Sequence, residues 1–87
     1  MQPPDAGDDV VVTFYIKDGT SQGDAQCETF YRTDRGSWVI QGKRRGDKVG
    51  AQLIGLAADE TFCEMSDPTM DRFVRHYVRE RYGVDLN

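Results

Sequence analysis

The sequence predicts an α+β domain in which an antiparallel sheet of about four strands is covered on one face by a C-terminal helix. Three patterns lead to this fold class: a strand-like alternation over 10–17, a hairpin pattern over 27–41 and an amphipathic helical pattern over 68–82. The chain has 87 residues, 38% of them hydrophobic, which is enough for one thin core and too little for a separate cofactor domain. We therefore expect a single domain over residues 10–87.

The segment before this domain has no apolar periodicity. Residues 1–9 combine two prolines, a glycine and three aspartates, a composition typical of a disordered acidic tail. Residues 18–26 are polar and contain two glycines, which is typical of a loop between strands. The predicted order of elements is β-β-β-short α-β-α.

The first strand is predicted from β-branched and aromatic residues that alternate with a period of two. This period places one set on the helix-covered face of the sheet: Val10, Val12, Phe14 and Ile16. The residues between them fall on the opposite, outer face: Val11, Thr13 and Tyr15. The outer face of this strand therefore has an apolar and aromatic character.

The hairpin is the clearest local pattern. Asp34-Arg35-Gly36 separates two strand-like runs, and a three-residue loop ending in glycine fits a type I turn followed by a left-handed residue. The register that this loop dictates pairs Arg32 with Trp38, Tyr31 with Val39 and Phe30 with Ile40. Tyr31 and Val39 then share the outer face of the sheet.

The next segment contains a basic stretch, a short helix and a last strand. Apolar residues recur with helical spacing after Asp47, which is available as an N-cap. Residues 61–65 predict a strand with Cys63 and Met65 facing inward and Phe62 on the outer face. The opposite register of this strand stays open.

The C-terminal helix has consistent start and stop signals, with Asp67 as cap, Pro68 in the first helical position and Gly83 past the end. At 100° per residue, one face is apolar: Met70, Phe73, Val74, Tyr77 and Val78. The opposite face is basic: Arg72, Arg75, His76 and Arg79.

The outer face of the sheet is the leading candidate for function. It would carry apolar and aromatic side chains that no remaining helix covers: Val11, Tyr15, Tyr31, Val39 and Phe62. Such a face marks a contact surface for a partner or for a second copy of the chain. The sequence therefore predicts a non-enzymatic protein-interaction module, unless the tail or the 18–26 loop folds over this face.

Charge is segregated along the chain, although the formal net charge is only −4. Residues 1–28 carry six acidic side chains and one basic one, whereas residues 29–56 carry six basic and two acidic ones. Two basic clusters result: Lys43, Arg44, Arg45 and Lys48 in one loop, and Arg72, Arg75 and Arg79 on one helix face. If the clusters converge they could bind phosphates, so a nucleic-acid-binding accessory protein is the alternative hypothesis.

Catalytic, metal and membrane functions have little support in the sequence. The single histidine, His76, has no nucleophile at helical spacing, and two distant cysteines with one histidine make no zinc-ligand pattern. We expect no catalytic residue, no metal and no cofactor. The absence of a signal-peptide pattern, of a long apolar run and of a disulfide framework predicts a cytoplasmic protein with no membrane segment.

The hairpin and the segments after it also resemble a known group of proteins. Residues 31–42, followed by Glu60-Thr61 and an acidic-apolar strand leading into a helix, resemble short actinobacterial proteins that are often encoded beside helix-turn-helix regulators, as BldB-like proteins are. The resemblance covers about residues 27–80 and departs from the group after Gly42, where basic residues 43–48 replace an apolar continuation. The resemblance implies a small intracellular regulatory or protein-binding protein, with a transcriptional regulator as a candidate partner and a homodimer as a candidate state.

Overall fold

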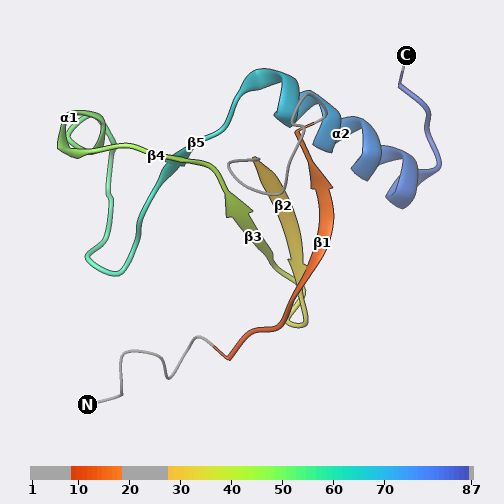
Figure 1. Cartoon of the computed structure of the whole chain (residues 1–87), viewed down its shortest axis with the longest axis horizontal. Helices are drawn as coiled ribbons and strands as arrows, with labels where there is room; N and C mark the ends of the chain where they lie inside the picture. The colour runs from red at the N-terminus through yellow and green to blue at the C-terminus, as the bar shows by residue number, and fades with distance from the viewer. Residues whose placement is uncertain (1–8, 19–27, 87) are drawn as a thin grey trace.

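The computed structural model describes residues 9–18 and 28–86 and confirms the α+β class (Figure 1). The order of elements is β1 (Val12–Lys17), β2 (Thr29–Thr33), β3 (Trp38–Gln41), β4 (Lys43–Arg44), α1 (Asp47–Gly50), β5 (Cys63–Glu64) and α2 (Asp67–Tyr82). The predicted tail lies outside the described residues except for Asp9, which forms an ion pair with Arg35. Most of the predicted 18–26 loop, and Cys27, also lie outside them.

The first three strands form an antiparallel sheet in the order β1-β2-β3. The register of the β2–β3 hairpin confirms the predicted pairing of Tyr31 with Val39 and its neighbours. Gly36 has a φ of 75°, the left-handed conformation that a glycine adopts at no steric cost. The hairpin could be predicted because loop length and turn chemistry together fix its register.

β1 contains an irregularity that the sequence pattern did not predict. Phe14 pairs with Tyr31 and Ile16 pairs with Phe30, so Tyr15 is the extra residue of a β-bulge. A bulge breaks the two-residue alternation, and Val12 and Phe14 therefore share the outer face with Tyr31. The predictions that Val12 and Phe14 face inward and that Tyr15 faces outward are wrong.

The predicted last strand is β5, and it pairs with β4 rather than with the three-stranded sheet. A Cβ at Gly42, between β3 and β4, would lie 2.7 Å from the backbone oxygen of Glu64 and 2.8 Å from Cys63 Sγ. β5 can therefore approach this closely only because residue 42 is a glycine. Cys63 is exposed and not part of a core, so its predicted inward orientation is wrong.

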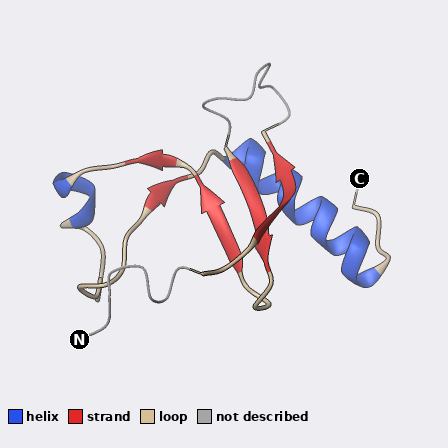
Figure 2. Ribbon diagram, turned by 60° about the horizontal axis from the view of Figure 1, so that its bottom comes forward, coloured by secondary structure: helices blue, strands red, loops and turns tan. Residues whose placement is uncertain are grey.

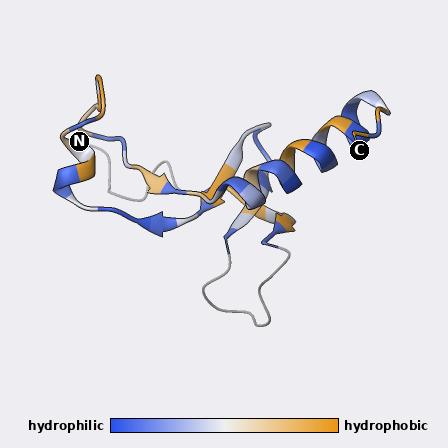
Figure 3. Cartoon of the chain, turned by 90° about the horizontal axis from the view of Figure 1, so that it is seen from above, coloured by the Kyte–Doolittle hydropathy of each residue, from blue (hydrophilic) through white to orange (hydrophobic). Residues whose placement is uncertain are grey.

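β4, α1 and β5 form an arm that extends away from the three-stranded sheet on the side opposite to α2 (Figure 3). α1 begins after Gly46, so Asp47 is the first helical residue rather than the cap. The apolar side chains of the loop after α1 are exposed, and Ile54 is 100% exposed.

α2 begins one residue earlier than predicted and ends where predicted. Its N-cap is Ser66, whose hydroxyl accepts a hydrogen bond from the Thr69 N–H, and Pro68 lies in the first turn. Gly83 closes the helix with a φ of 70°. Serine and aspartate are about equally good caps, so the sequence alone does not distinguish Ser66 from Asp67 as the capping residue.

α2 packs on one face of the three-stranded sheet (Figure 2). The Phe73 ring stacks on the Phe30 ring at a centroid distance of 4.1 Å. On this face Phe30 and Ile16 are the two buried apolar residues of the described chain. The helix is rotated about its axis relative to the predicted stripe, because Thr69 is buried whereas Met70 and Val74 are exposed.

The rotation of α2 has a polar cause at the helix N-terminus. The Glu28 carboxylate, just before β2, accepts hydrogen bonds from the Ser66 N–H (2.8 Å), the Ser66 hydroxyl (2.6 Å) and the Thr69 hydroxyl (2.6 Å). Hydrogen bonds to the carboxylate stabilise its ionised form. The bond from Ser66 has the larger effect and the bond from Thr69 the next largest, and together they lower the pKa of Glu28 below its usual value. The clasp ties Ser66 and Thr69 to the sheet and turns the Thr69 side of α2 inward.

Replacement of this carboxylate tests the clasp. We expect Glu28→Ala to lower the free energy of unfolding by about 2 kcal/mol, because charge-assisted bonds are lost and the buried Thr69 hydroxyl loses its acceptor. Urea denaturation followed by circular dichroism measures this change. Asp71→Ala is the matched control, because Asp71 pairs only with Arg75 at the surface and should cost less than about 0.5 kcal/mol. Equal losses in both variants would contradict the clasp.

The lowered pKa of Glu28 predicts a specific pH dependence. A carboxylate with a depressed folded-state pKa stabilises the fold above its unfolded-state value, about 4.3, and loses this effect as the pH falls through the folded-state value. We expect the stability difference between the wild-type chain and Glu28→Gln to be constant above pH ~5 and to shrink steadily in more acidic solution. A difference that stays constant in acid would exclude this origin.

Candidate interaction surfaces

The outer face of the sheet, opposite α2, presents an apolar patch that spans all three strands. Phe14, Tyr31 and Val39 lie side by side across the strands through the β1–β2 and β2–β3 registers. Phe14 is 58% exposed and Val39 is 41% exposed, and the Phe14 ring meets the Tyr31 ring edge-on at 6.5 Å. Val12 extends the patch along β1 and is also exposed. We call these four residues the outer-face patch.

Two of the five predicted contact residues, Tyr31 and Val39, belong to this patch. Tyr31 is half-buried, and its hydroxyl donates a hydrogen bond to Gln41 Oε1 at 2.9 Å. Val11 is exposed and precedes β1, where its N–H donates to Asp34 Oδ1. It therefore borders the patch rather than forming part of a strand.

The predicted positions of Tyr15 and Phe62 are wrong. The bulge turns Tyr15 toward α2, where its ring lies 4.8 Å from His76 and 5.8 Å from Phe73. Phe62 lies in the arm, with its ring 3.0 Å from where a Cβ of Gly50 would be. A two-residue period cannot reveal a bulge, which is why the sequence pattern selected Tyr15 in place of Phe14.

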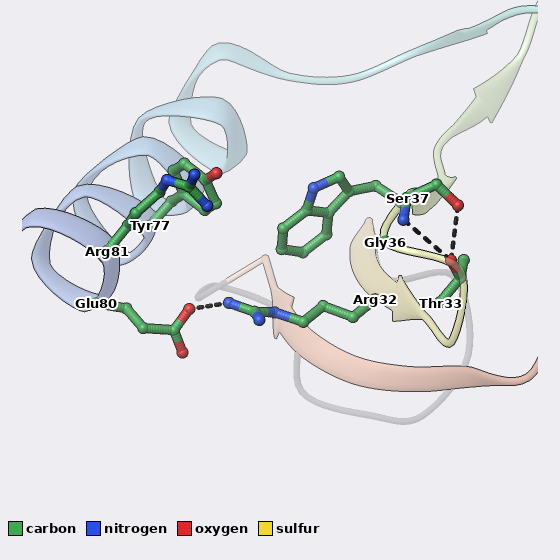
Figure 4. Close-up of a pocket in the computed structure, with 8 residues that line it drawn as sticks. Arg32, Thr33, Gly36, Ser37, Tyr77, Glu80 and Arg81 are labelled. Atoms are coloured by element: carbon green, nitrogen blue, oxygen red, sulfur yellow. Dashed lines mark hydrogen bonds and ion pairs between the residues drawn. The ribbon is translucent and has the colours of Figure 1, made fainter.

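The face that carries α2 contains a pocket of about 420 Å³ between the hairpin and the second half of α2 (Figure 4). Trp38 and Tyr77 form its aromatic walls and meet edge-on at 5.8 Å. Arg32 and Glu80 form an ion pair along one side. The Arg32 guanidinium also lies over the Trp38 ring at 5.1 Å, a cation–π contact.

Tyr15 supports the Arg32–Glu80 pair from the β1 side. Its hydroxyl donates to Glu80 Oε1 at 3.1 Å, and its ring faces the Arg32 guanidinium at 4.8 Å. Partial burial raises the pKa of the Tyr15 hydroxyl, and the nearby positive charge of Arg32 opposes this shift. Tyr15 is therefore a neutral hydrogen-bond donor around pH 7, and it holds this pair in position.

Arg81 lies at the pocket without an ion-pair partner among the residues that the structure describes. Its guanidinium lies 5.9 Å from the Tyr77 ring and 5.8 Å from the Tyr82 ring. A hydrogen bond with the Tyr82 side chain is the largest cause of the raised pKa of Arg81. Arg81 is absent from the predicted site residues, because the helix dipole alone explains a cation at the end of a helix.

The two predicted basic clusters do not converge. The elements that carry them, β4 with α1 on one side and α2 on the other, extend in opposite directions from the three-stranded sheet (Figures 1 and 2). Lys43, Arg44 and Lys48 are exposed in the arm, whereas Arg45 pairs with Glu64 at 2.6 Å.

The cationic side chains of α2 are largely occupied within the chain. Arg75 pairs with Asp71, and Arg79 pairs with Asp85 at 3.0 Å. Arg72 donates to the backbone oxygen of Lys17 at 3.0 Å. Phosphate binding by this helix face would therefore require existing interactions to break, which weakens the electrostatic argument for nucleic acid.

Within residues 9–18 and 28–86, no group of three His, Cys, Asp or Glu side chains is arranged to hold a metal ion. His76 is exposed and packs against Tyr15 rather than beside a nucleophile. Over the same residues no helix combines the length and the apolar character needed to cross a bilayer. Comparison of the chain with family models, curated proteins and solved structures found no match.

The two faces of the sheet predict different responses to truncation. Phe14→Ala should lower the free energy of unfolding by less than about 1 kcal/mol, because the side chain is already exposed. Phe30→Ala should cost about 3–5 kcal/mol, because it removes a buried ring. Denaturation in dilute solution compares the two, and a large loss for Phe14→Ala would show that the outer-face patch is covered within the single chain.

Proposed function

We propose that this chain is a non-enzymatic, cytoplasmic protein-interaction module that binds another protein through the outer-face patch. The observation that carries the proposal is the contrast between the two faces of one sheet. α2 covers one face, whereas Val12, Phe14 and Val39 are exposed on the other. Exposed apolar side chains gathered on one face are typical of surfaces that proteins cover with a partner.

The small core supports the same function. Within the described residues two apolar side chains are buried, whereas thirteen large apolar ones are exposed. A chain with this balance gains additional apolar burial by association. The outer-face patch contains no charged side chain, so its partner is expected to present an apolar surface. Resemblance to the short actinobacterial group favours a transcriptional regulator as that partner.

Nucleic-acid binding receives less support from the geometry. The two basic clusters extend in opposite directions, and several of their arginines already have acceptors within the chain. A protein that binds through phosphate contacts needs cations gathered on one surface. Binding of an apolar partner surface by the outer-face patch does not depend on such a gathering of cations.

The double variant Phe14→Asp, Val39→Asp tests the proposed surface. We expect it to remain folded and to lose its partner, because two charges would have to be desolvated in the contact. The full wild-type chain captures the partner from its native host, and binding of the purified pair is then measured for each variant. Ile54→Asp is the control, because Ile54 is equally apolar and fully exposed but lies in the arm.

Three outcomes are distinguishable. Loss of binding in the double variant alone supports the outer-face patch, whereas unchanged binding overturns it. A light-scattering mass that rises with concentration for the wild-type chain, but not for the double variant, would show that the partner is a second copy. Binding lost only in Ile54→Asp would move the contact surface to the arm.

A further inference from the structure

A second binding surface lies on the opposite side of the sheet, where the outer edge of β3 meets the flank of α2. β3 is the last strand of the order β1-β2-β3 and has no strand on its outer edge among the described residues. The Thr33 N–H donates to the Ser37 carbonyl at 3.0 Å, so Thr33 and Ser37 form a hydrogen-bonded pair of the hairpin. In an antiparallel pair of strands, every second residue bonds to the partner strand and the residues between them point away from it. The backbone N–H and C=O groups of Trp38 and Ile40 therefore point outward from the edge of β3.

The flank of α2 above this edge is apolar. His76 contacts Tyr15 on β1, and Tyr77 contacts Trp38 on β3. Going around the helix from His76 to Tyr77 therefore leads across the sheet from β1 to β3. At 100° per residue, the next positions beyond Tyr77 on the β3 side are Met70, Arg81 and Val74. Met70 is 37% exposed and Val74 is 41% exposed. These side chains therefore overhang the outer edge of β3.

The apolar surface continues onto the strand. Ile40 pairs with Phe30, whose ring stacks on Phe73, so its side chain lies on the face that carries α2. It is 48% exposed, because α2 covers β2 more fully than β3. An extended segment beside β3 would thus meet outward backbone groups at the edge and apolar side chains above it.

The position of the Arg81 guanidinium determines which end of such a segment would carry a carboxylate. The first turn of α2 is held at Glu28, near the end of β3, whereas Tyr77 and Arg81 lie beside Trp38 at its start. A strand antiparallel to β3 therefore ends at the pocket. Arg81 is available there for a carboxylate, and arginine binds carboxylates through paired charge-assisted hydrogen bonds.

We propose that the outer edge of β3 and the Met70–Val74 flank of α2 bind an extended segment of another protein as an added antiparallel strand, with a carboxylate of that segment bound by Arg81 at the pocket. Backbone hydrogen bonds to Trp38 and Ile40 would supply sequence-tolerant affinity, and alternate apolar side chains would pack on the flank. This site lies on the opposite face from the outer-face patch and does not depend on it.

Trp38 provides a direct readout, because it is the only tryptophan of the chain and lines the pocket. The probe is a six-residue peptide of alternating valine and threonine, titrated into the full chain while Trp38 fluorescence is recorded. Three forms are compared: a free C-terminal carboxylate, its C-terminal amide, and an amide with aspartate in the last position. We expect the first to bind about tenfold more tightly than the amide. The aspartate form shows whether a side-chain carboxylate serves equally.

Variants separate the two parts of the site. Arg81→Gln should reduce binding of the free acid to the level of the amide, whereas Arg79→Gln should leave it unchanged, because Arg79 pairs with Asp85. A peptide with alternate N-methylated amides should not bind, since it cannot donate to the strand edge. Binding that is insensitive to both Arg81→Gln and N-methylation, or no binding of any form, overturns the proposal.

The failure of this proposal is distinguishable from failure of the proposed function. The double variant Phe14→Asp, Val39→Asp should bind the peptide with unchanged affinity, because its substitutions lie on the other face of the sheet. Loss of peptide binding in this variant, with the fold intact by circular dichroism, would place the peptide on the outer-face patch and overturn the added-strand site.

Discussion

The carboxylate of Glu28 determines how the helix lies on the sheet, and most other features of the molecule depend on that placement. Three hydrogen bonds from the first turn of α2 converge on this one group. They turn Thr69 inward, which brings Phe73 onto Phe30 and leaves Met70 and Val74 at the side. A helix packed by hydrophobicity alone would be expected to bury the whole Met70–Val78 stripe. The clasp therefore accounts for an apolar flank that remains outside the core.

The aromatic residues of the covered face form a single connected group around Phe73. Its ring contacts Phe30, Trp38 and Tyr15 on three adjacent strands. Ring contacts of this kind contribute about 0.5–1.5 kcal/mol each beyond the burial of their area, so they offset part of the weakness of a small core. They also keep Trp38 at the pocket and Tyr15 beside the Arg32–Glu80 pair. The same side chains thus hold the fold together and form the walls of a binding site.

Local chemistry explains which parts of the structure could be predicted. The hairpin and the C-terminal helix have turn and cap residues that act within a few positions of one another, and the sequence predicts both. The rotation of α2 depends on Glu28, some forty residues away from Thr69 in the chain, and no local pattern contains that information. The pairing of β5 with β4 likewise depends on a close approach at Gly42. The sequence therefore predicts that the outer face is apolar and aromatic, and it places Tyr31 and Val39 there correctly. It assigns Tyr15 to this face, whereas the structure has Phe14 in that place.

The bulge in β1 gives the face under α2 a ring that a regular strand would not place there. Tyr15 and Ile16 are neighbours in the sequence, yet both face α2, whereas Phe14 faces outward. Deletion of Tyr15 would restore regular alternation with Phe14 still opposite Tyr31 and Ile16 still opposite Phe30, so both residues would keep their faces. The outer-face patch would remain, but the Arg32–Glu80 pair would lose the ring and the hydroxyl that support it. A change of one codon's length could thus alter the pocket without altering the outer-face patch.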